Sequence, residues 1–131
     1  MASRHLILAV DDEASLCEFY EKTLPLLGYD AAVSLSAKEA REAIRVRKPN
    51  LILMDIMMPG EDGIGFTREL RASAEYSDIP IIVVSGLADA ATLNDALLFG
   101  AVDYIVKPVE LEILKSKIER AIAAVENRKK K

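Results

Sequence analysis

The chain has 131 residues, 51% of them hydrophobic, and a formal net charge of −4. This length suits one domain with its own core and is too short for two ordinary domains, and the acidic balance argues against nucleic-acid binding across the whole surface. The single cysteine excludes an internal disulfide, and no apolar run has the length of a signal-peptide or membrane segment, so we expect a cytoplasmic protein.

Short apolar runs alternate with helical stretches, which is typical of a parallel sheet covered on both faces. Strands are predicted near residues 5–10, 30–34, 51–54, 80–84 and 102–106. Capping residues and helical periodicity predict helices at about 13–27, from 36 to before 49, from about 63, at about 89–100 and from about 110. We expect one α/β domain over residues 1–127, followed at 128–131 by a basic tail or the start of a linker.

Polar residues that phosphoryl chemistry uses stand at the ends of four predicted strands: Asp11 with Asp12, Asp55, Ser85 and Lys107. The carboxyl ends of parallel strands share one edge, where ligands bind, so we expect these side chains to share a cleft. Two carboxylates about 4 Å apart repel by roughly 4 kcal/mol at an effective dielectric constant of about 20. The cluster therefore predicts a bound cation, and its hard oxygen ligands favour Mg²⁺.

Each of these residues taken alone also has a simpler interpretation. Asp12 suits the N-cap of the next helix, Ser85 is ordinary in a loop, and an isolated Lys107 is most simply a solvated charge. Asp55 is not needed for the turn at 59–60, and at a strand end beside a metal it is placed to act as a nucleophile toward phosphorus. In that setting Lys107 is predicted to hold phosphoryl oxygens and Ser85 to donate to them.

Four segments together resemble the receiver domains of two-component response regulators. They are VDDE at 10–13, LMDIMMPGEDG at 53–63, PIIVVSG at 80–86 and GAVDYIVKP at 100–108. They stand in the order and spacing of that family, and the resemblance covers residues from about 4 to 125. It implies a flavodoxin-like, doubly wound parallel sheet of five strands in the order 2-1-3-4-5, with five helices.

The resemblance also implies a role for each matching site residue. Asp55 is the phosphoacceptor, while Asp12, Asp55 and the backbone carbonyl of Met57 bind Mg²⁺ directly and Asp11 acts largely through a bound water. Ser85 hydrogen-bonds the phosphoryl group and Lys107 pairs with it. Such a protein is a signalling phosphoacceptor that catalyses only its own phosphorylation and dephosphorylation.

The same resemblance implies a conformational switch and a set of partners. Tyr104 turns inward as Ser85 moves toward the phosphate, which alters the surface of the helix at 89–100, the strand at 102–106 and the last helix. The bond from Lys107 to Pro108 is expected to be cis. The implied phosphodonor is a histidine kinase or histidine phosphotransfer protein, and the implied output is a downstream effector or a fused domain. Neither nucleic acid nor membrane is expected to bind directly, and the chain is a monomer or a phosphorylation-linked homodimer.

Three other interpretations fit parts of the pattern. A haloacid-dehalogenase-like phosphatase also uses an Asp nucleophile, but its motif is Asp-x-Asp after the first strand, whereas Asp11 and Asp12 are adjacent. A receiver-like interaction module that is never phosphorylated would keep the fold without the chemistry. A flavodoxin would need a phosphate-binding loop rich in Gly, Ser and Thr after the first strand, and none stands there.

Overall fold

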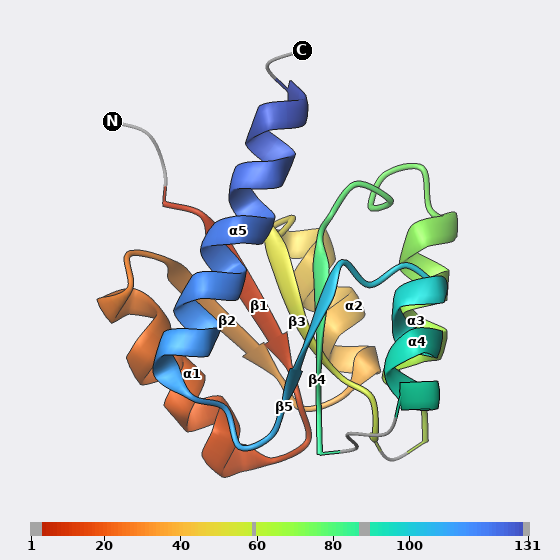
Figure 1. Cartoon of the computed structure of the whole chain (residues 1–131), viewed down its shortest axis with the longest axis horizontal. Coiled ribbons are helices and arrows are strands. Elements are labelled where there is room, and N and C mark those ends of the chain that lie inside the picture. The colour runs from red at the N-terminus through yellow and green to blue at the C-terminus, as the bar shows by residue number, and fades with distance from the viewer. Residues whose placement is uncertain (1–3, 59, 87–89, 130–131) are drawn as a thin grey trace.

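Five short strands form a parallel sheet between two layers of helices (Figure 1). The computed structural model describes residues 4–58, 60–86 and 90–129, and at position 90 only the backbone. The strands are β1 (Leu6–Val10), β2 (Asp30–Ser34), β3 (Leu51–Asp55), β4 (Ile81–Ser85) and β5 (Asp103–Val106). The helices are α1 (Ala14–Leu26), α2 (Ala37–Val46), α3 (Gly63–Ala72), α4 (Ala90–Leu98) and α5 (Leu111–Lys129).

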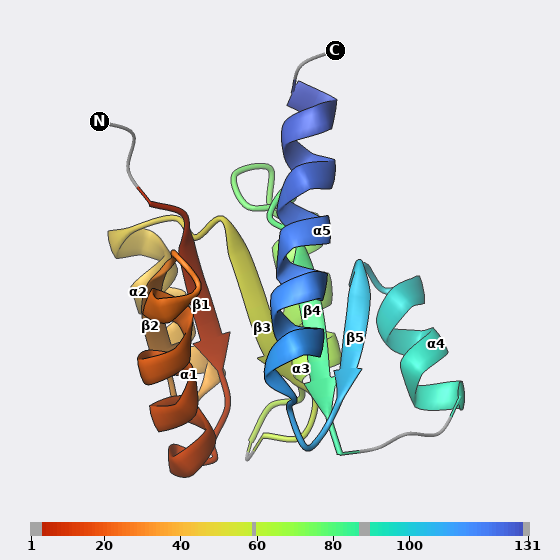
Figure 2. The ribbon, with the colours of Figure 1, turned by 60° about the vertical axis from the view of Figure 1, so that its left-hand side comes forward.

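The strand order is β2-β1-β3-β4-β5, and every neighbouring pair is parallel. This confirms the predicted doubly wound, flavodoxin-like sheet. The residues of β1, β3 and β4 are all buried, as expected for apolar strands covered on both faces. All five strands point to one edge of the sheet, and α5 extends past the opposite edge (Figure 2). Polar residues at the strand ends are thereby gathered at a single edge.

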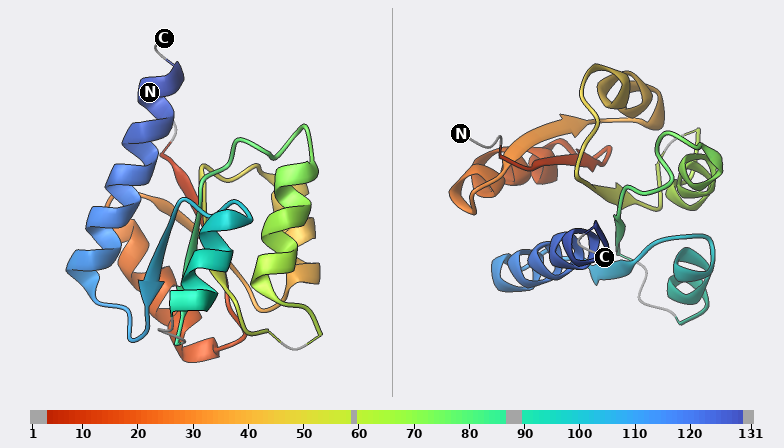
Figure 3. Two further views of the ribbon diagram at one scale, coloured as in Figure 1. Left: turned by 45° about the vertical axis from the view of Figure 1, so that its right-hand side comes forward. Right: turned by 90° about the horizontal axis from the view of Figure 1, so that it is seen from above.

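Each face of the sheet carries its own hydrophobic cluster, because successive strand residues point to opposite faces. On one face, Ile7 and Leu53 pack with Tyr20 of α1 and with α5. On the other, Leu8 packs with Phe66 of α3 and with α2. The view along the strands shows α1 and α5 on one side of the sheet and α2, α3 and α4 on the other (Figure 3). The strands that carry the polar residues at their carboxyl ends are therefore held in place by helices packed on both faces of the sheet.

Most predicted element ends are confirmed within a residue or two, and some details differ. The N-cap residue of α1 is Glu13, without a side-chain cap, so the interpretation of Asp12 as the helix cap is wrong. Gly28 follows α1 with φ +100°, the left-handed conformation that commonly ends a helix. The helix α5 continues through Lys129, so the first half of the basic run is helical, while residues 130–131 lie outside the described part. The predicted start of the fourth helix at Asp89 also lies outside it.

The helices of the described residues show no membrane-spanning character. None of them is both long enough and apolar enough to cross a bilayer.

Candidate functional site

The carboxyl ends of β1 and β3 bring three carboxylates together. One oxygen each from Asp11, Asp12 and Asp55 lies within 4.8 Å of the others. Asp11 and Asp55 are 1% and 4% exposed, whereas Asp12 is exposed to solvent. The proximity follows from the register, because Val10 pairs with Met54 and each acidic residue comes next along its strand. The predicted meeting of these three residues is therefore confirmed.

The Asp11 carboxylate is only half satisfied by the protein. Its Oδ1 accepts a hydrogen bond from the Glu13 N–H at 2.9 Å. Its Oδ2 is buried and has no hydrogen-bond partner among the described residues, although the Lys107 ammonium lies 3.0 Å away as an ion pair. Because this buried anionic oxygen is held, within the described part of the chain, only by its contact with the Lys107 ammonium, it is suited to a cation ligand role.

Lys107 reaches the cluster from the end of β5. Its Nζ lies 3.0 Å from Asp11 Oδ2, 3.4 Å from Glu13 Oε2 and 3.6 Å from Asp55 Oδ1. Its N–H donates to the Ser85 carbonyl at 2.8 Å, which extends the β4–β5 pairing to this residue. The following peptide bond to Pro108 is cis, as predicted. Lys107 is therefore held by its backbone beside β4 while its side chain crosses to β1 and β3.

Negative charge exceeds positive charge in the cleft. The pKa of Asp55 is raised to about 6, mainly by burial and then by the charge of Asp11. Lys107 and the Met57 N–H lower this pKa, but they only partly offset the rise. Burial disfavours the Lys107 ammonium most, yet the neighbouring Asp11, Asp55 and Glu13 outweigh it and raise the pKa of Lys107. One ammonium thus faces several carboxylates. The all-oxygen donor set, the unsatisfied Asp11 oxygen and the excess charge together fit a hard divalent cation such as Mg²⁺.

Glu13 is a cleft residue that sequence reasoning did not single out. It is 3.4 Å from the Lys107 ammonium, and it is the third acidic residue in the run that begins at Asp11. The acidic run itself was the available signal. Only the fold shows that a lysine 94 positions later returns to this carboxylate.

Ser85 and Tyr104 lie on the neighbouring strands, next to the acidic cluster. Ser85 is the last residue of β4 and 1% exposed, and its strand neighbour Val84 pairs with Asp55. Tyr104 of β5 is half-buried against the small cluster under α4. From α5, the Lys117 ammonium donates to the Tyr104 carbonyl at 2.5 Å and lies 4.8 Å from the centre of its ring. The fold therefore brings Asp11, Asp12, Asp55 and Lys107 together at one edge, with Ser85 at the end of the neighbouring strand and Tyr104 farther back along β5.

The loop after β3 forms one wall of the site. Met57 is 63% exposed and, with Asp12 and Asp62, lines a hollow of about 450 Å³ beside the acidic cluster. Asp62 itself is occupied as the N-cap of α3, accepting from the Gly65 N–H at 2.6 Å. At the far end of the loop, the Gly63 N–H donates to the Ile56 carbonyl at 2.8 Å.

Comparisons with known proteins agree with this geometry. The family model of the response regulator receiver domain matches residues 7–119. The probable transcriptional regulator ycf27 of Cyanophora paradoxa is 39% identical over 121 residues, which are 92% of this chain and 49% of that protein. The transcriptional regulatory protein ZraR of Escherichia coli O157:H7 is 34% identical over 117 residues, or 89% of this chain and 26% of that protein. The chain spans about half the length of most of the curated relatives it matches.

A solved structure shows the same fold over nearly the whole chain. The CheY-like response regulator receiver domain protein of Methanospirillum hungatei superposes with a TM-score of 0.89 at 28% identity, covering 96% of this chain and 99% of that one. The family match, the strand order and the acidic cluster agree with one another. The chain therefore belongs to the response regulator receiver domains, the signalling phosphoacceptors of two-component systems.

Proposed function

We propose that Asp55 is the residue that accepts the phosphoryl group. The observation that carries this proposal is the position of its buried carboxylate, 3.6 Å from the Lys107 ammonium and within the cluster of Asp11 and Asp12. Asp12 is exposed, and Asp11 Oδ1 is already engaged by the Glu13 N–H. Asp55 thus combines a position at the end of β3 with a carboxylate that lies close to both the Lys107 ammonium and the other two acidic residues.

The proposed donor is a phosphohistidine on a histidine kinase or a histidine phosphotransfer protein. An oxygen of Asp55 forms a bond to phosphorus while the P–N bond of the donor breaks, and the electron pair leaves with the imidazole nitrogen. Lys107 holds the charge that develops on the phosphoryl oxygens, and Ser85 donates a hydrogen bond to them. Positioned charges of this kind supply most of the catalysis in phosphoryl transfer.

The proposed metal ligands are Asp11, Asp12, Asp55 and the backbone carbonyl of Met57. When bound there, Mg²⁺ would neutralise charge on the carboxylates and on the phosphoryl oxygens. The unsatisfied Asp11 oxygen and the raised pKa of Asp55 both support a cation at this position.

The proposed output is a change of the α4–β5–α5 surface, with Ser85 and Tyr104 as the switch residues. Tyr104 is half-buried and packs against a cluster that includes Ile56, the residue after Asp55, and Ala96 of α4. The recipient is a downstream effector or a domain joined to this one, with residues 1–127 as the receiver and 128–131 as a basic tail or the start of a linker. With a kinase that uses ATP as the source of phosphate, the cytoplasm is the proposed compartment.

Intact-mass measurement after incubation with Mg²⁺ and acetyl phosphate tests the assignment of Asp55. One phosphoryl adduct is expected in the parent protein, and none in Asp55→Asn or when EDTA replaces Mg²⁺. Asp78→Asn is the matched control, because Asp78 is an exposed aspartate paired with Lys48 outside the site. It should label like the parent.

Undiminished labelling of Asp55→Asn would assign the phosphoacceptor to another residue. A folded parent protein that takes up no phosphoryl group under any condition would instead favour the receiver-like interaction module.

A further inference from the structure

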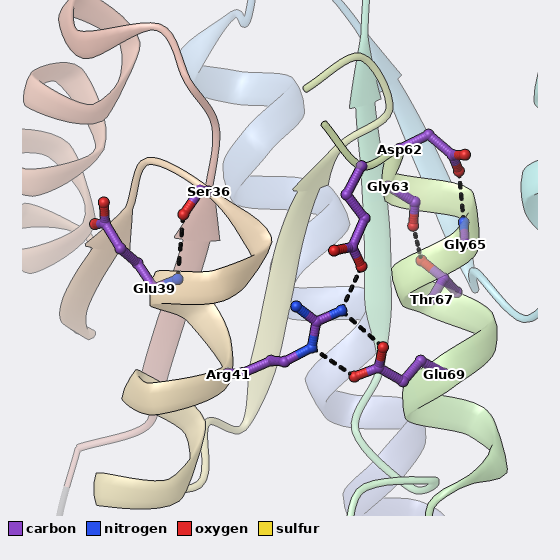
Figure 4. Close-up of polar contacts among 9 residues, drawn as sticks. Ser36, Glu39, Arg41, Asp62, Gly63, Gly65, Thr67 and Glu69 are labelled. Carbon is purple, nitrogen blue, oxygen red and sulfur yellow. Dashed lines mark hydrogen bonds and ion pairs between the residues drawn. The ribbon is translucent and has the colours of Figure 1, made fainter. Parts of the chain in front are cut away.

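An ion-pair network joins α2, the β3–α3 loop and α3 beside the site (Figure 4). Arg41 of α2 donates to the Glu61 carboxylate of the loop. It also pairs with Glu69 of α3, with 2.8 Å from Nε to Oε2 and 2.7 Å from Nη2 to Oε1. One guanidinium therefore links three parts of the chain that come from different elements.

The position of this guanidinium does not depend on Glu61. Its two hydrogen bonds to Glu69 form a planar, bidentate pair, the geometry for which arginine is best suited. Its central carbon also lies 4.9 Å from the centre of the Phe66 ring, which is fully buried. The hydrogen bond from Arg41 is the main cause that lowers the pKa of Glu69, which keeps this carboxylate charged. Arg41 thus gives the loop a fixed point of attachment on α2 and α3.

The described residues of the loop, 56–58 and 60–62, are attached mainly at the two ends of the loop. Its ends are tied by the bond from the Gly63 N–H to the Ile56 carbonyl and by the Asp62 cap of α3. Between them, Met58 is buried in the core under α2 and α3, and the bond from the Glu61 N–H to the Met58 carbonyl is long, at 3.4 Å. The contact of Glu61 with Arg41 is a polar attachment of this part of the loop to α2.

We propose that Arg41 is a positioning residue for the metal site and acts through Glu61. The same loop carries Met57, which lies two residues after Asp55 and whose carbonyl is a proposed Mg²⁺ ligand. By fixing Glu61, Arg41 restricts the orientations available to the Met57 peptide groups. The loop therefore loses less conformational entropy when the cation binds. The inference rests on the proposed function of the acidic cluster. It assigns part of the affinity of this cluster for Mg²⁺ to residues outside the cleft.

Glu61→Gln is the test variant, because it weakens the attachment and leaves the pair of Arg41 with Glu69 in place. In the Mg²⁺-free protein, ¹H–¹⁵N heteronuclear NOE values of residues 57–58 and 60–62 should fall, while those of α3 stay unchanged. In a Mg²⁺ titration followed by amide shifts, the Kd should rise about two- to fivefold, the range that one partly exposed ion pair supports. In an Arg41→Met background, adding Glu61→Gln should have little further effect, because both changes remove the same contact.

Glu42→Gln is the matched control. Glu42 is an exposed carboxylate of α2 that pairs with Arg45, so the change removes the same charge without touching the loop. It should leave both the NOE values and the Kd for Mg²⁺ at parent values. An equal rise in Kd for Glu42→Gln would overturn the proposal in favour of a long-range charge effect.

Two further outcomes separate this inference from the proposed function. A parent protein that binds Mg²⁺ and labels at Asp55, with Glu61→Gln binding Mg²⁺ equally well, would overturn the positioning role alone. A folded parent protein whose amide signals do not respond to Mg²⁺ would overturn the proposed metal site and this inference with it.

Discussion

Two buried oxygen atoms near the site lack hydrogen-bond partners within the described residues, and they have different meanings. Asp11 Oδ2 lies 3.0 Å from the Lys107 ammonium and belongs to the carboxylate cluster, where a cation would satisfy it. The Tyr20 hydroxyl belongs to a side chain in the core between α1 and the sheet. Burial, followed by the charge of Asp11, raises the pKa of Tyr20, so this hydroxyl stays neutral. Asp11 Oδ2 is therefore placed to bind a cation in the site, whereas the buried Tyr20 hydroxyl lowers the stability of the fold.

Tyr20→Phe tests this distinction at a single atom. Because the hydroxyl is buried without a described partner, its removal should leave the free energy of unfolding unchanged or raise it by up to about 1 kcal/mol. Urea unfolding of the two proteins measures the difference. Tyr20→Ala, which also removes the ring, should cost about 3–5 kcal/mol. A loss above about 1 kcal/mol for Tyr20→Phe would mean that the hydroxyl has a hydrogen bond after all.

At the scale of elements, the turn from β3 into α3 positions Asp55, the proposed phosphoacceptor. A Cβ atom on Gly63 would lie 2.0 Å from the carbonyl oxygen of Asp55, so a larger residue cannot follow the same path. The backbone of the helix start is thereby in direct contact with the end of the strand. The absence of a side chain at position 63, rather than any unusual backbone angle, permits this approach, since Gly63 is not among the glycines with positive φ.

Gly63→Ala should therefore destabilise the protein although alanine is the better helix former. We expect a loss of about 1–3 kcal/mol in the free energy of unfolding, typical of overpacking in a close contact, together with slower labelling of Asp55 by acetyl phosphate. Gly65→Ala is the control two positions along α3, where the nearest atom to the added Cβ is 3.4 Å away. It should be neutral or stabilising, by up to about 1 kcal/mol. Equal behaviour of the two variants would contradict the role assigned to Gly63.

At the scale of the whole molecule, charge is distributed unevenly between the two ends of the sheet. The carboxyl edge carries Asp11, Asp12, Glu13 and Asp55 around Lys107, while a hollow of about 340 Å³ at the other end is lined by Arg71, Arg128 and Lys129. Repulsion at the carboxyl edge opposes folding unless a cation offsets it. Folding and metal binding are therefore expected to be thermodynamically linked.

Mg²⁺ should accordingly raise the free energy of unfolding. A ligand that binds only the folded state adds about 2.7 kcal/mol at a free concentration of about 100 times its Kd. Urea titrations with MgCl₂ and with choline chloride at equal ionic strength separate binding from screening. Asp12→Asn should lose most of the Mg²⁺ effect and keep the response to choline chloride. Equal stabilisation by both salts in the parent protein would argue against a specific site.

Sequence patterns were sufficient to predict the helices and strands and to select the acidic residues that meet in the site. Runs such as LILAV and IIVVS have no polar residue before their last position and are too short for helices, which leaves buried parallel strands as the consistent assignment. Parallel strands end at one edge, and the strand order implied by the family resemblance makes the first and third strands neighbours, so the meeting of Asp11, Asp12 and Asp55 could be predicted without coordinates. The order of the strands came from the family resemblance, because local patterns do not specify which strands become neighbours.

Contacts between residues far apart in the chain were decided only by the tertiary structure. Glu13 meets Lys107, and Arg41 meets both Glu61 and Glu69, because packed helices and loop paths bring these side chains together. The structure also decided the cap of α1, because local preference favours Asp12 as the N-cap residue and the fold has Glu13 there instead. The sequence by itself determined which elements form and which residues reach the site edge, since periodicity and residue type act locally. The ion pairs around the site could be identified only from the tertiary structure, because a charged side chain pairs with whichever groups the packing of the elements brings close to it.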